Sequence, residues 1–268
     1  AVAVQRQPQQ RLVRRADPRH LGARVDVGSD PRRRYTVAGQ INRTVDRAGL
    51  SQTIYSLDLG FKPADNVEVQ VGPDLTRLRQ PAQYVTTITD PAATRTFGRR
   101  YVFAPLEQTT LAIDTRLNVT FSPRLTLELY AQPFASSNDF GGLKELRAPR
   151  TFDFDRYGVD VGSLTTDAGG AATVDPDGGG AAPAFRVADR DFDLTSLRGN
   201  AVLRWEWREG STLYLVWQQD RVERLTGTEA GLRGRDVGSL DLGASAGDLF
   251  AVRPSNVLLF KVSYWMNR

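Results

Sequence analysis

The residues best suited to chemistry in this chain are carboxylates, because cysteine is absent and His20 is the only histidine. Thiol catalysis is excluded, and zinc sites and a Ser-His-Asp triad are nearly so. Asp114 and Glu128 remain a possible acid pair, since two carboxyl groups ~5–9 Å apart can hydrolyse a glycoside. Charged residues along a wet surface explain both without catalysis. We therefore expect no enzyme activity and keep a surface glycoside hydrolase as the weakest alternative.

A second group of carboxylates lies in a Gly- and Asp-rich segment that contains the sequences DPDGGG and DRDFD. Carboxylate oxygens are the ligands that Ca²⁺ prefers, although no EF-hand spacing is present. A hydrated loop kept soluble by its charges is the simpler interpretation. The sequence thus predicts no cofactor, with Ca²⁺ at the cell surface as an alternative. The candidate ligands are Asp175, Asp177, Asp191 and Asp193.

The elements that must position these groups are strands, because apolar and polar residues alternate along much of the chain. In residues 111–121 the odd positions are mostly apolar and the even positions mostly polar. Successive side chains of a strand point to opposite faces, so this segment has one apolar and one charged face. The pattern predicts roughly eight to nine long strands. The other alternating segments are residues 25–27, 35–41, 55–61, 67–71, 125–129, 203–207, 213–217 and 258–264.

Two kinds of connection separate the predicted strands. The longest connection, at about 138–190, is a low-complexity surface loop that we expect to be flexible, with little to bury. If the strands run up and down, all short turns fall at one end and all long loops at the other. Short turns are predicted at residues 29–32, 62–66, 122–123 and 209–210, and the remaining long loops at 89–98 and 222–255.

Charge and hydropathy restrict the partners. The 35 basic residues are interleaved with 31 acidic ones, which favours a solvated mixed surface over a nucleic-acid patch. Residues 1–17 form a flexible basic amino-terminal segment. No run of about 18 apolar residues is present, so a transmembrane helix is not expected. The first residues lack a signal-peptide pattern, which leaves an intracellular protein, a mature chain or a fragment.

Two environments can satisfy a sheet with one apolar face. In a soluble barrel or sandwich that face points inward and could enclose a small ligand. In an outer-membrane barrel it contacts lipid, and the polar face lines a lumen. We favour the membrane, because several apolar strands reach the ~9–11 residues that cross a bilayer and aromatic residues lie near strand ends. The predicted lumen-lining residues are Asp114, Arg116, Glu128, Arg198, Arg204 and Glu206, and the predicted lipid-facing residues are Leu117, Leu127, Leu203, Trp205, Trp207, Leu215 and Trp217.

Three segments resemble the carboxy-terminal barrel of a bacterial outer-membrane family of unknown function. They are GRRYVFAPLEQTTLAIDTRLNVTFSPRLTLELYAQPF, SLRGNAVLRWEWREGSTLYLVWQQDR and NVLLFKVSYW. The resemblance extends from about His20 onward. It implies an all-β, antiparallel, up-and-down transmembrane barrel in the bacterial outer membrane. Full-length members carry an amino-terminal module similar to family-nine carbohydrate-binding domains, which implies a surface or transport protein linked to glycan handling.

The chain departs from that family in two ways. It lacks the carbohydrate-binding module and the earlier barrel strands, so a glycan partner would bind through a module absent here. It also ends YWMNR rather than on an aromatic residue. Residues 18–268 would form the carboxy-terminal part of a barrel, and the chain would be a fragment. Unpaired strand edges are untenable in hydrocarbon, so either the strand count is wrong by one or the chain belongs to something larger. The expected partner is outer-membrane lipid, not nucleic acid.

Overall fold

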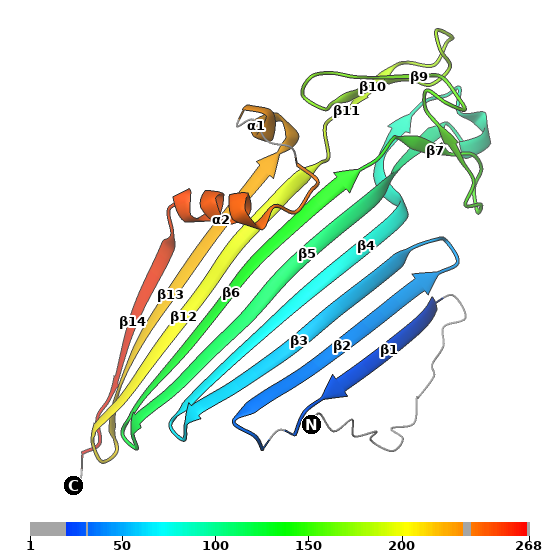
Figure 1. Cartoon of the computed structure of the whole chain (residues 1–268). Coiled ribbons are helices and arrows are strands. Elements are labelled where there is room, and N and C mark those ends of the chain that lie inside the picture. The colour runs from blue at the N-terminus through cyan, green and yellow to red at the C-terminus, as the bar shows by residue number, and fades with distance from the viewer. Residues whose placement is uncertain (1–19, 31, 233–236, 267–268) are drawn as a thin grey trace.

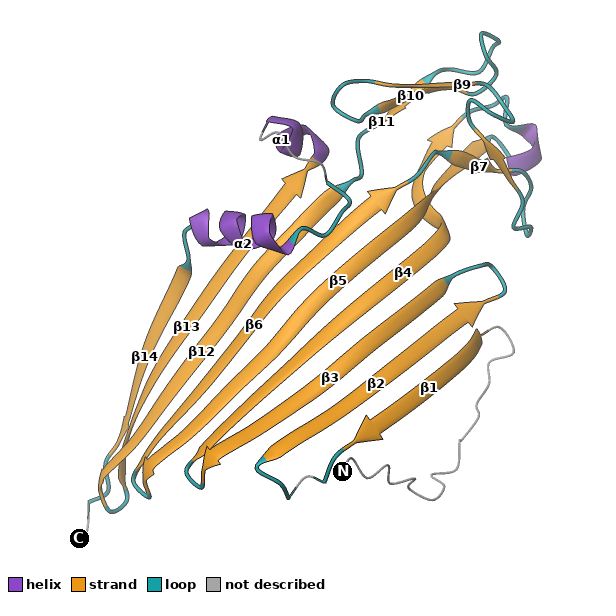
Figure 2. Ribbon diagram, in the orientation of Figure 1, coloured by secondary structure: helices purple, strands orange, loops and turns teal. Residues whose placement is uncertain are grey.

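The computed structural model describes residues 20–30, 32–232 and 237–266. These residues form one large, curved antiparallel sheet with a folded extension at one end (Figures 1 and 2). The predicted amino-terminal segment, residues 1–17, lies outside the described residues. None of the helices in the described part of the chain is long and apolar enough to span a membrane.

Nine strands follow one another along the main sheet, and each pairs antiparallel with its neighbours. This arrangement confirms the all-β antiparallel prediction and the nine alternating segments. The strands exceed the predicted lengths, since the two longest contain 23 and 24 residues. The strands are β1 (His20–Gly28), β2 (Tyr35–Asp46), β3 (Ser51–Ala64), β4 (Val67–Thr89), β5 (Arg99–Ser122), β6 (Leu125–Phe140), β12 (Phe192–Arg208), β13 (Ser211–Thr226) and β14 (Ser255–Ser263).

The turns at one end of the sheet match the predicted ones. They lie at residues 29–34, 65–66, 123–124 and 209–210, and Gly210 adopts the positive φ of 72° that the last of them uses. The other end carries the three long connections, at residues 90–98, 141–191 and 227–254.

One short turn contradicts the prediction that all of them share an end. Residues 47–50 connect β2 to β3 among the long loops. Asp46 Oδ1 accepts a hydrogen bond from the Leu50 N–H at 2.8 Å, and Gly49 has a φ of 88°. A side chain that closes a compact turn and a glycine with positive φ explain why this connection needs no long loop.

The register places apolar residues opposite apolar residues across the sheet. Leu203 lies opposite Leu127 on β6 and Leu215 on β13. Towards the other edge, Val25 on β1 lies opposite Ile41 on β2. Because side chains alternate along each strand, one face of the sheet is apolar and the other is polar. These are called the apolar face and the polar face below.

The described sheet is open. β1 pairs only with β2, β14 pairs only with β13, and the two lie at opposite sides of the sheet (Figure 1). The predicted closure into a barrel is therefore not seen within the described residues. Both edge strands carry a row of backbone N–H and C=O groups without a ladder partner.

Residues 141–191, here called the cap, are folded, so the prediction of a flexible loop with little to bury is wrong. Val174 has an exposed fraction of 0%. The Gly-rich sequences form turns, while isolated apolar residues between them supply buried side chains. The cap contains β7 (Lys144–Leu146), which pairs with β5, and β8 (Phe154–Arg156), which pairs with β7, together with a separate sheet of β9 (Ser163–Thr166), β10 (Ala172–Asp175) and β11 (Phe185–Val187).

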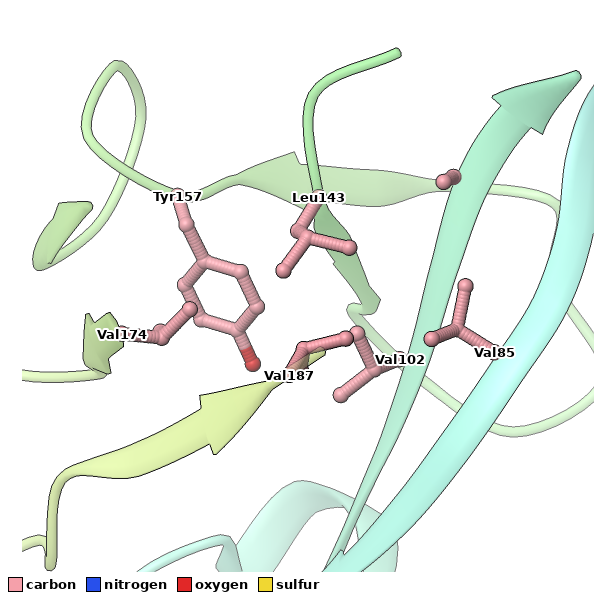
Figure 3. Close-up of a cluster of buried hydrophobic side chains, with 7 residues drawn as sticks. Val85, Val102, Leu143, Tyr157, Val174 and Val187 are labelled. Carbon is pink, nitrogen blue, oxygen red and sulfur yellow. The ribbon is translucent and has the colours of Figure 1, made fainter. Parts of the chain in front are cut away.

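The cap is held by a hydrophobic core at the long-loop end of β4 and β5 (Figure 3). Val102 and Ala104 occupy even-numbered positions of β5, where buried residues alternate with less buried odd-numbered ones, so they continue the polar face. The cap therefore covers this end of the polar face. The buried core residues are Val85, Val102 and Ala104 from the long strands and Leu143, Tyr157, Val174 and Val187 from the cap.

No helix was expected from the sequence, but short helices lie near the long-loop end. They are η1 (Thr94–Thr96), α1 (Gly227–Leu232) and α2 (Leu242–Ala251). The Asp241 side chain caps α2 by accepting a hydrogen bond from the Ala244 N–H. Arg221 of β13 donates to the carbonyls of Phe250 at 3.2 Å and Val252 at 3.4 Å, which fixes the helix end to the sheet. α2 is Gly- and Ala-rich, so its sequence has little helical periodicity.

Candidate functional site

The six predicted lumen-lining residues all lie on the polar face. Arg116 lies opposite Tyr130, and Arg204 lies opposite Thr126 and Tyr214. All six residues occupy even-numbered positions of β5, β6 and β12, and the register between these strands joins even to even. The structure thus brings Asp114, Arg116, Glu128, Arg198, Arg204 and Glu206 to one surface.

Several of these charges are already engaged in short-range contacts. Asp114 accepts hydrogen bonds from the Tyr130 hydroxyl and from Gln132 Nε2. The Arg116 guanidinium lies 5.6 Å from the centroid of the Tyr130 ring. Cross-strand contacts of this kind stabilise ionic groups on a wet face without burying lone charges.

Two further arginines of β12 form ion pairs. Arg204 Nη2 lies 3.3 Å from Glu206 Oε2, and Arg198 Nε lies 3.9 Å from Asp220 Oδ1. Glu206 Oε1 also accepts a hydrogen bond from the Gly210 N–H at 3.2 Å, which links the pair to the β12–β13 turn. These partly exposed pairs contribute little to stability.

Asp114 and Glu128 do not lie side by side. Glu128 is opposite Asn118 on β5, four positions along the strand from Asp114. At ~3.3 Å per residue this offset separates the two positions by about 13 Å along the strands. Glycosidases place their carboxyl groups ~5–9.5 Å apart, so the backbone spacing does not favour this pair as a catalytic dyad.

The polar face contains a hollow of about 570 Å³ near the short-turn end. It lies over β3 and β4 between the β1–β2 turn and β5. Asp114 and Arg116 are the only sequence-predicted residues that line it within the described chain. The remaining charged lining residues, which the sequence analysis did not single out, are Arg33, Arg34, Asp58, Lys62 and Glu68.

Glycines create the space of the hollow. Gly60 and Gly72 occupy even-numbered positions of β3 and β4, so a side chain at either position would stand on the polar face. A Cβ at Gly60 would lie 2.2 Å from Thr36 Oγ1, and one at Gly72 would lie 3.4 Å from Asp58 Oδ1. The signal available in the sequence was a glycine at the polar position of two otherwise alternating strands.

The seven predicted lipid-facing residues all belong to the apolar face. The rings of Trp205 and Trp207 contact each other at a centroid distance of 6.4 Å. Trp205 is 47% exposed and Trp217 is 39% exposed. Leu117, Leu127, Leu203 and Leu215 are partly exposed, and none of them belongs to a buried core.

Exposed apolar side chains continue over the whole width of the sheet. Phe260 on β14 has an exposed fraction of 72%. Contiguous apolar surfaces of this kind are unusual on soluble monomers and are typical of surfaces that contact lipid or protein. Other exposed apolar residues of this face are Leu21, Val25, Val27, Tyr35, Val37, Ile41, Tyr55, Leu57, Leu59, Phe61, Phe121, Leu258 and Val262.

A buried ionic network joins the cap to the long strands. Arg100 of β5 lies 2.6 Å from an Asp90 oxygen and 2.7 Å from a Glu145 oxygen, and the Tyr157 hydroxyl donates to Glu145 at 2.9 Å. Burial acts to lower the pKa of Arg100, but the hydrogen bonds to Glu145 and Asp90 raise it above its ordinary value. Burial and Glu145 also raise the pKa of Tyr157. The network therefore stays ionised at Arg100 and neutral at Tyr157.

The predicted calcium ligands accept hydrogen bonds from backbone N–H groups, two of them in local turns and two from distant segments. Asp175 accepts from the Gly178 N–H at 3.0 Å, and Asp177 accepts from Ala182 at 2.8 Å. Asp191 accepts from the Phe140 N–H at 2.7 Å, and Asp193 accepts from the Gly238 N–H at 3.2 Å. No group of three or more metal-ligating side chains occurs in the part of the chain that the structure describes. The structure thus does not assemble these carboxylates into the predicted alternative Ca²⁺ site.

Comparisons of the chain with protein-family models, with curated proteins and with solved structures found no match. The family resemblance of the three sequence segments stays a prediction. The features that bear on function are therefore the two faces of the sheet, the hollow and the cap.

Proposed function

We propose that the main sheet is part of a transmembrane β-barrel of a bacterial outer membrane, in which the apolar face contacts lipid and the polar face lines a lumen. The observation that carries this proposal is the apolar face itself, which continues across nine strands and is exposed or partly exposed. An outward apolar band and a polar interior are the two features that such barrels combine.

The length of the apolar alternation supports this proposal. In β5 it runs from Leu111 to Phe121. About ten residue steps of ~3.4 Å, tilted by ~40°, cover about 26 Å along the membrane normal. The apolar band of outer-membrane barrels is ~25 Å tall. The other part of β5, from Arg99 to Thr110, and the cap would then project beyond the lipid.

The two edge strands, β1 and β14, each lack a strand neighbour on one side. In hydrocarbon each unpaired N–H or C=O group costs several kcal/mol. We therefore propose that β1 and β14 pair with further strands in the complete barrel. A surface or transport protein linked to glycan handling remains the expectation from the family resemblance.

A soluble barrel or sandwich that binds a small ligand is the competing arrangement. It would bury the apolar face in its interior. The cap of this chain instead packs its buried core against Val102 and Ala104, even-numbered residues of β5 on the side of the polar face. The cap thus leaves the apolar face uncovered, which favours the membrane arrangement.

Intrinsic tryptophan fluorescence tests this proposal, because Trp205, Trp207 and Trp217 lie on the same face. The chain is refolded in lipid vesicles that contain brominated acyl chains, and in matched vesicles without bromine. We expect a blue-shifted emission that the brominated lipid quenches and that aqueous iodide quenches weakly. Strong iodide quenching without an effect of brominated lipid, in chains that have associated with the vesicles, would overturn the proposal.

A further inference from the structure

We propose that the hollow on the polar face binds a small solute that carries an oxyanion, either a phosphate or a carboxylate group. This inference deepens the proposed function and rests on it, because the hollow must open into water on the lumen side. Its volume of about 570 Å³ lies within the usual range of small-molecule sites, ~300–1,000 Å³. Its lining contains four basic and three acidic side chains, so the basic charges are in excess.

The carboxylates of the hollow are largely occupied by partners within the sheet. Glu68 lies 3.4 Å from Lys62 Nζ and accepts a hydrogen bond from Gln70 at 3.1 Å. Asp114 accepts from Tyr130 and Gln132, both on β6. These contacts direct the acidic groups to neighbouring side chains and reduce their competition for the arginines.

The arginines of the hollow, in contrast to its carboxylates, are not held in ion pairs by other described residues. Among the described residues, no carboxylate lies within salt-bridge distance of Arg33, Arg34 or Arg116. The Arg116 guanidinium carbon lies over the Tyr130 ring, 5.6 Å from its centroid, which is a cation–π contact. A guanidinium presents paired N–H donors that match the oxygens of a carboxylate or phosphate. These three side chains are therefore the groups expected to hold the oxyanion.

The shape of the hollow restricts the size of the solute. The floor is the backbone around Gly60 and Gly72, where side chains are missing from the polar face. Thr36 and Asp58 stand at its side and offer hydrogen-bonding groups to hydroxyls. Asp58 would also repel a highly charged anion. We therefore expect a compact solute with one oxyanion group and hydroxyls.

Titration calorimetry with glycerol 3-phosphate tests the site, with glycerol as the uncharged counterpart. The full chain is folded in detergent micelles or vesicles. We expect glycerol 3-phosphate to bind and glycerol not to bind. Arg116→Gln should weaken binding about tenfold or more. Arg198→Gln, which removes a polar-face arginine outside the hollow, should leave the affinity within about twofold of the unmodified chain.

A second pair of variants tests whether the solute occupies the hollow. Gly72→Leu fills the hollow at a position where a Cβ meets ordinary contacts, and we expect it to abolish binding. Gly22→Leu adds the same side chain to the polar face of β1, where the nearest atom is 3.9 Å away, and should bind normally. Binding that survives Gly72→Leu would overturn the inference.

Three other outcomes would also overturn it: no binding of either glycerol 3-phosphate or its carboxylate counterpart glycerate at millimolar concentration, equal binding of glycerol, or equal weakening by both arginine variants. Tryptophan quenching by brominated lipid is recorded on the same samples. If quenching is normal and binding is absent, the anion site fails while the membrane proposal stands. If quenching is absent, the membrane proposal fails first.

Discussion

Neighbouring residues of one strand have opposite surroundings in this sheet. Leu203 stands on the apolar face opposite Leu127 and Leu215, while Arg204 stands on the polar face and pairs with Glu206. The alternation alone predicted this assignment, because the two-residue periodicity of a strand fixes which side chains share a face. If the apolar face contacts lipid, a charge placed on that face should lower the free energy of unfolding.

Leu203→Arg should destabilise the folded chain in lipid by about 2–4 kcal/mol if the residue lies near mid-membrane, because it places a charge in hydrocarbon. Arg204→Leu, the matched change on the other face, should have a small effect. Urea titration of the chain folded in vesicles measures both free energies of unfolding. Equal tolerance at the two positions would contradict the face assignment. A soluble barrel predicts that Arg204→Leu is harmless but that Leu203→Arg also unfolds the chain in the absence of lipid.

Asp191 should make the attachment of the cap depend on pH. Burial and the nearby Asp189, Asp139 and Asp193 raise its pKa above the ordinary 3.8. A raised pKa means that protonation favours folding, so this contribution is present below about pH 4 and is lost as pH rises through the folded-state pKa. Asp191→Asn keeps an acceptor for the Phe140 N–H and removes the charge. The variant should therefore be more stable than the unmodified chain at pH 7 and similar to it at pH 4.

The free energy of unfolding, measured at both pH values for both chains, tests whether the charge of Asp191 destabilises the folded chain. Hydrogen-exchange protection of the Phe140 amide, corrected for intrinsic exchange rates, gives the local readout. A variant that is less stable than the unmodified chain by the same amount at pH 4 and pH 7 would show that Asp191 acts only as a hydrogen-bond acceptor.

Not all residues of the hollow could be predicted from the sequence. Asp114 and Arg116 follow from the alternation of β5, and both line the hollow. Arg33 and Arg34 come from a turn, and their position beside β3 and β4 depends on how the hairpins pair. Gly60 and Gly72 form a floor only because the register of β3 and β4 brings both to the polar face. Sequence alternation gives faces, but it does not give these cross-strand neighbours.

Among the elements, the long strands followed from the sequence and the cap did not. Each long strand repeats one simple pattern, so its face and approximate position are encoded locally. The cap strands contain only three or four residues each. Their stability depends on long-range contacts with Val85 and Val102. A Gly- and Asp-rich composition therefore suggested a flexible loop where tertiary contacts produce a folded one.

Val174→Asp should unfold the cap, because it places a carboxylate at a fully buried position at a cost of about 3 kcal/mol or more. Val159→Asp makes the same change in the same segment at a position that is 69% exposed, and should have little effect. Limited trypsin digestion tests both, since the cap contains exposed Arg150 and Arg156. We expect faster cleavage within residues 141–191 only for Val174→Asp. Rapid cleavage of the unmodified cap would contradict its folded state.

At the scale of the whole molecule, the sheet has two faces with defined surroundings and two edges without ladder partners. The sequence predicted the number of strands in the path, because nine alternating segments correspond to nine strands. It could not predict how the edges are satisfied. Alternation specifies the direction of side chains, whereas edge pairing depends on backbone groups that every residue shares.

The amides of β14 should become fully protected when the chain assembles in lipid. With β13 as its only neighbour, β14 has every second N–H directed away from the ladder. Pairing with a further strand would protect these amides as well. Hydrogen exchange in vesicles, with β3 as the internal reference because it has neighbours on both sides, measures the pattern. If every second amide of β14 still exchanges rapidly in lipid, the proposed pairing of this edge is wrong.

The orientation of the two faces is tested most directly by single cysteines, because the chain contains none. Leu203→Cys and Arg204→Cys are each labelled with a polarity-sensitive fluorophore in the chain refolded in vesicles. The account predicts that brominated lipid quenches the label at position 203 and that aqueous iodide quenches the label at position 204. The reverse pattern, or the same quenching at both positions, would contradict it.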